Sequence, residues 1–117
     1  MILFELPYPP TVNHYYRRVG AKTLISSQGR RYRQRVCEQL IILGLARRPL
    51  QGDLAMTLKI YPPDRRRRDI DNVLKSLLDA LQHGGLYRDD NQIKRLTIEM
   101  LPPARRGRAF VQLEEVA

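Results

Sequence analysis

Short stretches of alternating or extended apolar residues predict five β-strands along this chain. Apolar and polar positions alternate most clearly at 54–60, where the even-numbered residues form one apolar face and Ala55, Thr57 and Lys59 point the other way. Prolines follow several of these stretches and end them. The predicted strands are Ile2–Leu6, Lys22–Ile25, Leu54–Ile60, Leu96–Met100 and Ala109–Leu113.

Apolar residues spaced three or four apart predict two helices. The first begins at a Ser26 or Ser27 cap and ends near Gly44. Its apolar positions are Tyr32, Val36, Leu40 and Leu43. The second helix runs from about Ile70 to Gln82, and its apolar face consists of Ile70, Val73, Leu74, Leu77, Leu78 and Leu81. We interpret the intervening polar and aromatic segment Asn13–Arg18 as a loop.

The order of these elements, β-(β)-α-β-α-β-β, predicts an α+β fold in which a mixed β-sheet packs with two main helices. A length of 117 residues predicts a single domain, residues 1–117, and the 43% hydrophobic content supports a folded chain. Cys37 is the only cysteine, which excludes an intramolecular disulfide and a zinc site built on several thiolates.

The sequence shows no targeting or membrane segment. Its N-terminal residues lack the basic and apolar regions of a secretory signal peptide. The longest apolar run, Leu40–Ala46, is much shorter than the roughly 20 residues of a membrane-spanning helix. We therefore expect a cytoplasmic protein that has no membrane partner.

The net charge indicates a polyanionic ligand. Twenty-one Lys and Arg residues against 12 Asp and Glu residues give a net charge of +9. A field of this sign on a small protein attracts nucleic acid. The alternatives are a basic surface that only solubilises the chain and an RNA binder of ribosomal type. Charge alone does not indicate an enzyme.

Four consecutive arginines, Arg65–Arg68, precede the second predicted helix. Cations at a helix N-terminus are unfavourable because that end of the helix dipole is positive. A bound phosphate reverses the effect, since guanidinium and backbone N–H groups then converge on one anion. The run therefore favours a polyanionic ligand, and a merely solvated charge run is the alternative.

Asp69 and Asp71 follow the arginines directly, at the start of the helix. Because a cap residue lies outside the helical geometry, two carboxylates at this spacing can converge on one ion, and Mg²⁺ prefers such oxygen ligands. A third carboxylate would come from Asp89 or Asp90, beyond the Gly84-Gly85 stop. The alternatives are that Asp69 is a helix cap, that Asp71 pairs with Lys75, and that the Asp89-Asp90 pair is a solvated turn.

Three segments of the sequence resemble the RusA family of Holliday-junction resolvases, found in bacteria and often on prophages. They are LPYPPTVNHYYRR at the start, PPDRRRRDIDNVLKSLLDAL in the centre and GGLYRDDNQI after the second helix. The resemblance implies a RusA-like, homodimeric endodeoxyribonuclease. Such an enzyme binds four-way junctions and nicks two opposing strands symmetrically, in DNA recombination and repair.

The resemblance also assigns residues. Asp69, Asp71 and Asp90 correspond to the catalytic aspartates that hold Mg²⁺, for which Mn²⁺ is a possible substitute. Lys75 corresponds to the family's essential lysine, which also contacts DNA, and Asn72 has a supporting role. The arginines Arg65, Arg66, Arg67 and Arg68 correspond to the family's basic stretch near DNA.

The early motif adds further candidates for DNA contact, namely Asn13, Tyr15, Tyr16, Arg17 and Arg18. The two tyrosines could stack on unpaired bases at the crossover, although at least one of them could equally belong to the core. Two other functions remain open from sequence alone. The chain could be a non-catalytic nucleic-acid-binding module, or a nuclease that acts on other branched DNA or on RNA.

Overall fold

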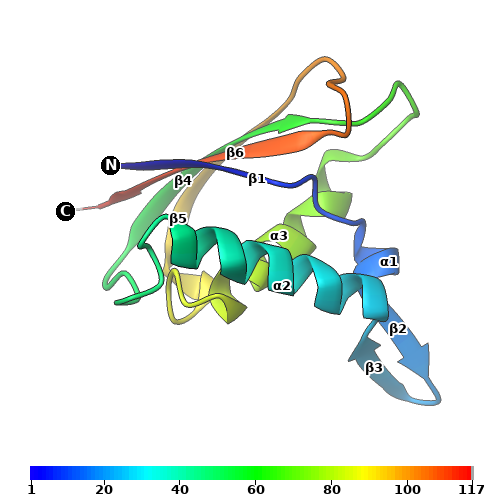
Figure 1. Cartoon of the computed structure of the whole chain (residues 1–117), viewed down its shortest axis with the longest axis horizontal. Helices are drawn as coiled ribbons and strands as arrows, with labels where there is room; N and C mark the ends of the chain where they lie inside the picture. The colour runs from blue at the N-terminus through cyan, green and yellow to red at the C-terminus, as the bar shows by residue number, and fades with distance from the viewer. Residues whose placement is uncertain (117) are drawn as a thin grey trace.

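Two layers make up the computed structural model, which describes residues 1–116. A four-stranded sheet with the strand order β1-β6-β4-β5 forms one layer, and the helices α2 and α3 cover one of its faces (Figure 1). The strands of this sheet are β1 (Ile2–Leu6), β4 (Leu54–Tyr61), β5 (Ile93–Met100) and β6 (Arg108–Glu115). The helices are α1 (Val12–Tyr15), α2 (Ser27–Ile42) and α3 (Leu74–His83), with 3₁₀ turns η1 (Ile70–Val73) and η2 (Asp90–Gln92).

The sheet is mixed, which confirms the predicted α+β fold. β4 and β5 are parallel neighbours, connected through η1, α3 and η2, whereas β6 pairs antiparallel with both β1 and β4. The predicted inward set of β4 is confirmed, since Leu54, Met56, Leu58 and Ile60 are at most 1% exposed. Ala55, expected to face outward into solvent, is only 6% exposed because Glu114 and Arg95 lie beside it in register.

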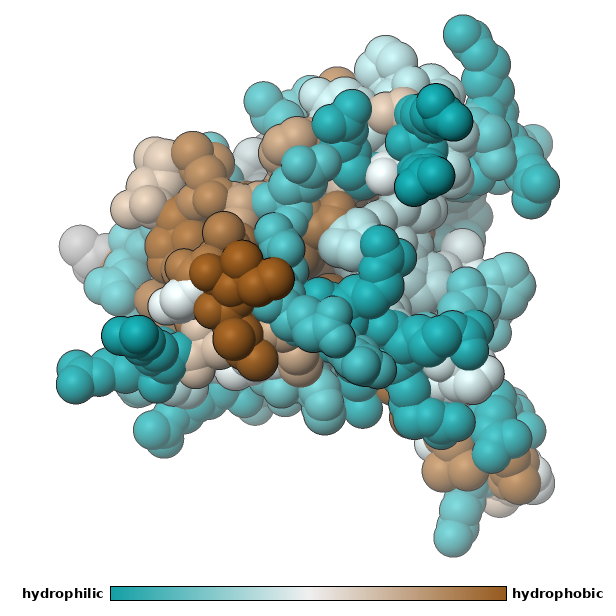
Figure 2. Space-filling model, viewed as in Figure 1, coloured by the Kyte–Doolittle hydropathy of each residue, from teal (hydrophilic) through white to brown (hydrophobic). Residues whose placement is uncertain are grey.

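Helix α2 begins where predicted, because the Ser26 side chain caps it by accepting a hydrogen bond from the Gly29 N–H at 2.9 Å. Tyr32, Val36 and Leu40 are buried as expected. The assignment of Leu43 to the same face is wrong, since Leu43 is 44% exposed. The helix ends at Ile42, and Leu43 is its C-cap residue, next to the exposed residues Ile41, Ile42 and Gly44 at this end of the helix. The brown patch over this end of α2 in Figure 2 contains exposed isoleucines.

The second predicted helix is present but starts differently. Residues Ile70–Val73 form a 3₁₀ turn, and regular α-helix begins only at Leu74. Val73, Leu77 and Leu81 are buried as predicted. Ile70 is 40% exposed, so its assignment to the buried face is wrong. It is the first residue of the 3₁₀ turn, and its neighbours Asp69 and Asp71 are exposed as well.

The segment Asn13–Arg18 is not a loop. Its first half lies in α1 and its second half in β2 (Tyr16–Val19), which pairs antiparallel with β3 (Lys22–Ile25). This two-stranded hairpin projects from the body of the molecule near the start of α2 (Figure 1). Within residues 1–116, no helix combines the length and apolar character needed to cross a membrane.

Candidate active site

Asp69 and Asp71 stand at the start of η1, and both are exposed. Asp69 occupies the N-cap position, yet its side chain makes no capping hydrogen bond; only its backbone oxygen accepts one, from the Asn72 N–H at 3.2 Å. Asp71 and Lys75 do not form an ion pair within 4.0 Å, and Lys75 lies near Asp90 instead. The two structural explanations for these carboxylates therefore fail, and within residues 1–116 neither side chain has a hydrogen-bond or ion-pair partner that would keep it from a ligand.

The turn around η2 assigns different tasks to Asp89 and Asp90. Asp89 builds the turn: its side chain accepts a hydrogen bond from the Asn91 N–H at 2.9 Å and forms a capping box with Gln92. Asp90 donates its backbone N–H to the Gln82 side chain and points its carboxylate at Lys75, with Oδ2 3.8 Å from Nζ. Asp90, the second residue of the pair, is thus the one available for chemistry.

The predicted convergence of Asp69, Asp71 and Asp90 is not seen. Among residues 1–116, no three His, Cys, Asp or Glu side chains are grouped closely enough to hold a metal ion. The Asp90 carboxylate comes back to the first turn of α3, but it lies near the Lys75 ammonium and not in a group with the other two carboxylates. Asp69 and Asp71 nevertheless suit a hard divalent cation, since Mg²⁺ is commonly held by one or two carboxylates together with a substrate phosphate.

The four arginines differ in how far the fold uses them. Arg68 is a structural residue of the loop: its side chain is 15% exposed, pairs with Asp64 at 2.7 Å and lies over the Tyr8 ring. The backbone N–H of Arg66 and the Arg68 side chain hold the pKa of Asp64 below its usual range. Arg65, Arg66 and Arg67 are exposed.

Tyr15 is fully buried, so its predicted stacking on bases is wrong. Its hydroxyl donates to Asp79 on α3 and accepts from Nε of Arg33 on α2 at 2.9 Å. Arg33 also pairs with Asp79, with Nη2 2.7 Å from Oδ2. Burial and the Asp79 bond raise the pKa of Tyr15. Burial opposes ionisation of Asp79, but the bonds from Tyr15 and Arg33 outweigh it and lower the pKa of Asp79.

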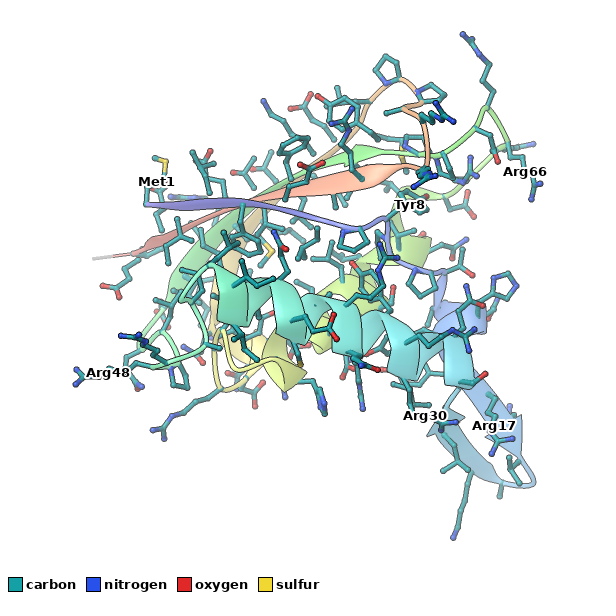
Figure 3. The ribbon with its side chains drawn as sticks, viewed as in Figure 1. Met1, Tyr8, Arg17, Arg30, Arg48 and Arg66 are labelled. Carbon is teal, nitrogen blue, oxygen red and sulfur yellow. The ribbon has the colours of Figure 1, made fainter. Side chains whose placement is uncertain are left out.

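This Tyr15–Arg33–Asp79 cluster joins α1, α2 and α3, and sequence reasoning missed two of its three members. A signal was present: Asp79 interrupts an otherwise apolar stretch of α3, four residues after Lys75. Tyr16 is half-buried and packs edge-on against Tyr15, with ring centroids 4.8 Å apart. Asn13 on α1 and Arg17 and Arg18 on the hairpin are exposed. Figure 3 shows Arg17 on the projecting hairpin.

Comparison with known proteins identifies the family. The sequence model of the family described as "Endodeoxyribonuclease RusA" matches residues 7–114. The chain belongs to the RusA family. This membership covers the arginine loop, both exposed aspartates and the η2 turn, which all lie within the matched residues.

Several curated RusA proteins are similar over nearly their whole length. The crossover junction endodeoxyribonuclease RusA of Enterobacteria phage HK97 is 39% identical over 97% of this chain and 96% of its own length. The protein of the same name from Enterobacteria phage 82 is also 39% identical, over 95% of this chain and 92% of its own. The RusA of Escherichia coli K12 is 37% identical over the same shares.

Proposed function

We propose that this RusA-family chain is a metal-dependent endodeoxyribonuclease that resolves four-way DNA junctions by paired symmetric nicks. The observation that supports this most directly is the pair Asp69 and Asp71, exposed and unused by the fold, next to a basic loop. A protein that only binds nucleic acid gains nothing from free carboxylates inside its most basic stretch. The names of the relatives, crossover junction endodeoxyribonucleases, specify the substrate class.

Asp69 and Asp71 are the proposed ligands of Mg²⁺, with Asp90 as the third and Mn²⁺ as a possible substitute. When bound, the metal lowers the pKa of a water molecule and polarises the phosphoryl oxygen. Asp90 would have to exchange Lys75 for the cation in order to join the other two carboxylates. The exchange costs little free energy, because the Lys75 and Asp90 side chains are 56% and 32% exposed and an exposed ion pair is weak.

Lys75 and the arginine loop act on the DNA in this proposal. Lys75 is the second residue of α3, four positions after Asp71, and its ammonium stabilises charge that develops on the phosphate or the leaving oxygen. Asn72, half-buried beside Asp69, positions the start of η1 through its backbone bond to Asp69. Arg65, Arg66 and Arg67, together with Arg17 and Arg18 of the hairpin, contact phosphates of the arms.

The proposal is tested by incubating the protein with a labelled synthetic four-way junction, with Mg²⁺ and with a chelator in its place. We expect nicks at symmetric positions in two opposing strands with Mg²⁺, and binding without nicks under chelation. Flap, linear duplex and RNA substrates run in parallel distinguish a junction resolvase from a nuclease of other specificity. Junction binding without cutting in any divalent metal would instead support the non-catalytic binding module.

We further propose that the active form is a homodimer, because a junction with near-twofold symmetry requires two equivalent sites. Two surfaces are candidates for the dimer interface, the sheet face opposite the helices and the exposed apolar end of α2. The sheet face is the better candidate. It has a hollow of about 270 Å³ lined by residues that include Leu3, Tyr61 and Phe110. By register, this face also bears three acidic and three basic side chains, Glu5, Glu99, Glu114, Lys59, Arg95 and Arg108. Because acidic and basic side chains are equal in number on this face, although the chain as a whole has a net charge of +9, the face suits a second copy of the chain better than it suits DNA.

Replacing Phe110 by Glu is expected to convert the dimer to monomer, because the change places a charge in the centre of the proposed interface. The mass in solution, measured by light scattering across a concentration series, checks this. The matched control is Ile42→Glu, which adds the same charge at the exposed apolar end of α2, where Ile42 is 78% exposed. If Ile42→Glu dissociates the dimer and Phe110→Glu does not, the end of α2 is the interface.

The relatives come from two phages and from Escherichia coli, which supports the expected bacterial or prophage origin. We propose that the chain acts on DNA in the cytoplasm of a bacterial cell.

A further inference from the structure

A large cavity lies between the arginine loop and the N-terminal half of α2. Its volume is about 700 Å³, and the residues that line it come from the proline-rich start of the chain, α2 and the loop 63–68. It adjoins a second cavity of about 350 Å³ that reaches Asp69 and Asn72, and Thr11, Arg67 and Arg68 line both. The two form one groove that leads from the candidate active site to α2, and Figure 3 shows Tyr8 in the region between Arg66 and α2.

Arg31 and Arg35 stand on the α2 wall of this groove, one helical turn apart and both exposed. Like charges at this spacing repel each other on a helix. None of the ion pairs formed by residues 1–116 includes either of them. The fold therefore tolerates two adjacent cations that it does not neutralise, as it does with Arg67 on the opposite wall.

The floor of the groove is less polar than its walls. Pro9 and Tyr32 are buried there, and the Tyr32 hydroxyl donates to the Pro7 carbonyl at 2.9 Å. The Tyr8 hydroxyl is buried, and no hydrogen-bond partner for it occurs among residues 1–116. A groove with cationic walls and an apolar floor matches the chemistry of a nucleic-acid strand, with phosphates at the rim and sugars below.

We propose that this groove binds the DNA strand that leads away from the cut phosphate, with Arg31 and Arg35 on one side of its backbone and Arg66 and Arg67 on the other. The inference rests on the proposed nuclease function and extends it to α2, which neither the motif nor the family resemblance assigns to DNA. Guanidinium groups on both walls grip successive phosphates through paired hydrogen bonds. Helix α2 thereby fixes the direction in which a junction arm leaves the active site.

The first test compares two double variants that each remove two positive charges. Arg31→Ala/Arg35→Ala changes the groove, whereas Arg47→Ala/Arg48→Ala changes exposed arginines beyond the other end of α2 (Figure 3). Binding of a fluorescent four-way junction is measured by anisotropy under chelation, at several salt concentrations. We expect the groove variant to bind at least about tenfold more weakly, with a salt slope reduced by nearly two, since each lost phosphate contact removes about 0.9. Equal losses in both variants would overturn the proposal, because they would reflect net charge alone.

A second test locates the contact on the DNA. In one junction, neutral methylphosphonates replace the phosphates within a few nucleotides of the cut site. Binding of the wild type and of the groove variant is then measured on this junction and on the unmodified one. If the arginines bind these phosphates, the neutral backbone and the arginine substitutions have less-than-additive effects on binding. Full additivity for every substituted position would contradict the proposed path of the strand.

These outcomes separate this inference from the proposed nuclease activity. Binding under chelation does not depend on catalysis, so a protein that never cuts can still show the groove contact. Conversely, normal cutting of the junction together with unchanged binding of the groove variant would refute the groove and leave the nuclease proposal intact. Because both arginines are exposed, their truncation is not expected to unfold the chain, which circular dichroism confirms or denies.

Discussion

The variant Asp71→Asn is expected to lose cleavage of a four-way junction while binding it at least as tightly as the wild type. Asparagine keeps the size of the side chain but removes the negative charge that a divalent cation requires. Loss of a group that acts on transition-state charge lowers the rate by about 10³-fold or more. Removal of a negative charge beside the arginine loop also reduces repulsion of DNA phosphates, so binding is unchanged or tighter.

Single-turnover cleavage with Mg²⁺ and anisotropy under chelation measure the two effects separately. The matched control is Asp53→Asn, because Asp53 is also exposed but lies just before β4, away from both groove and aspartates. We expect the control to cut at a rate within about twofold of the wild type, as a surface change outside the site should. Normal cutting by Asp71→Asn would show that the aspartates are structural and would favour the binding-module alternative.

The variant Gly29→Ala is expected to destabilise the fold by about 1–3 kcal/mol, the usual range for overpacking a tight contact. A methyl group at position 29 would lie 2.3 Å from the Tyr15 carbonyl oxygen and 2.8 Å from Cγ1 of Ile25. The carbonyl oxygen is not free to move, because it accepts a hydrogen bond from the Ser26 N–H at 2.9 Å. The clash thus falls between α2 and the segment that holds Tyr15 and the hairpin.

Urea denaturation measures this loss, and the change also lowers the melting temperature by roughly 4–8 °C per kcal/mol for a small domain. The control is Gln28→Ala on the exposed side of the same helical turn, which should change stability by less than about 0.5 kcal/mol. An unaltered midpoint in Gly29→Ala would mean that α1 and the hairpin are not packed against α2 as the structure shows.

The strands and helices could be predicted from sequence because their signals are local. The alternation at 54–60 and the three-to-four spacing in α2 and α3 depend only on near neighbours along the chain. Errors arose where an element ended or changed type. Leu43 lies just past the end of α2, and Ile70 lies in a 3₁₀ turn rather than an α-helix.

The candidate site was predictable in its residues but not in its arrangement. The motif identifies Asp69, Asp71 and Lys75 because they are close in sequence, and the resemblance adds Asp90. Only the structure shows that Asp69 does not cap its helix, that Asp89 builds a turn, and that Asp90 lies near Lys75. These facts depend on backbone geometry that the residue types do not specify.

By itself, the sequence determined the α+β class, the basic character, the acidic motif and the family. Each of these depends on residue type or on spacing over a few positions. The tertiary structure alone decided that Tyr15 is buried against Arg33 and Asp79 and that Arg68 lies over the Tyr8 ring. It also placed Arg31 and Arg35 opposite the arginine loop across one groove. The reason is that these arrangements join residues dozens of positions apart, and their contacts form only when the helices pack on the sheet.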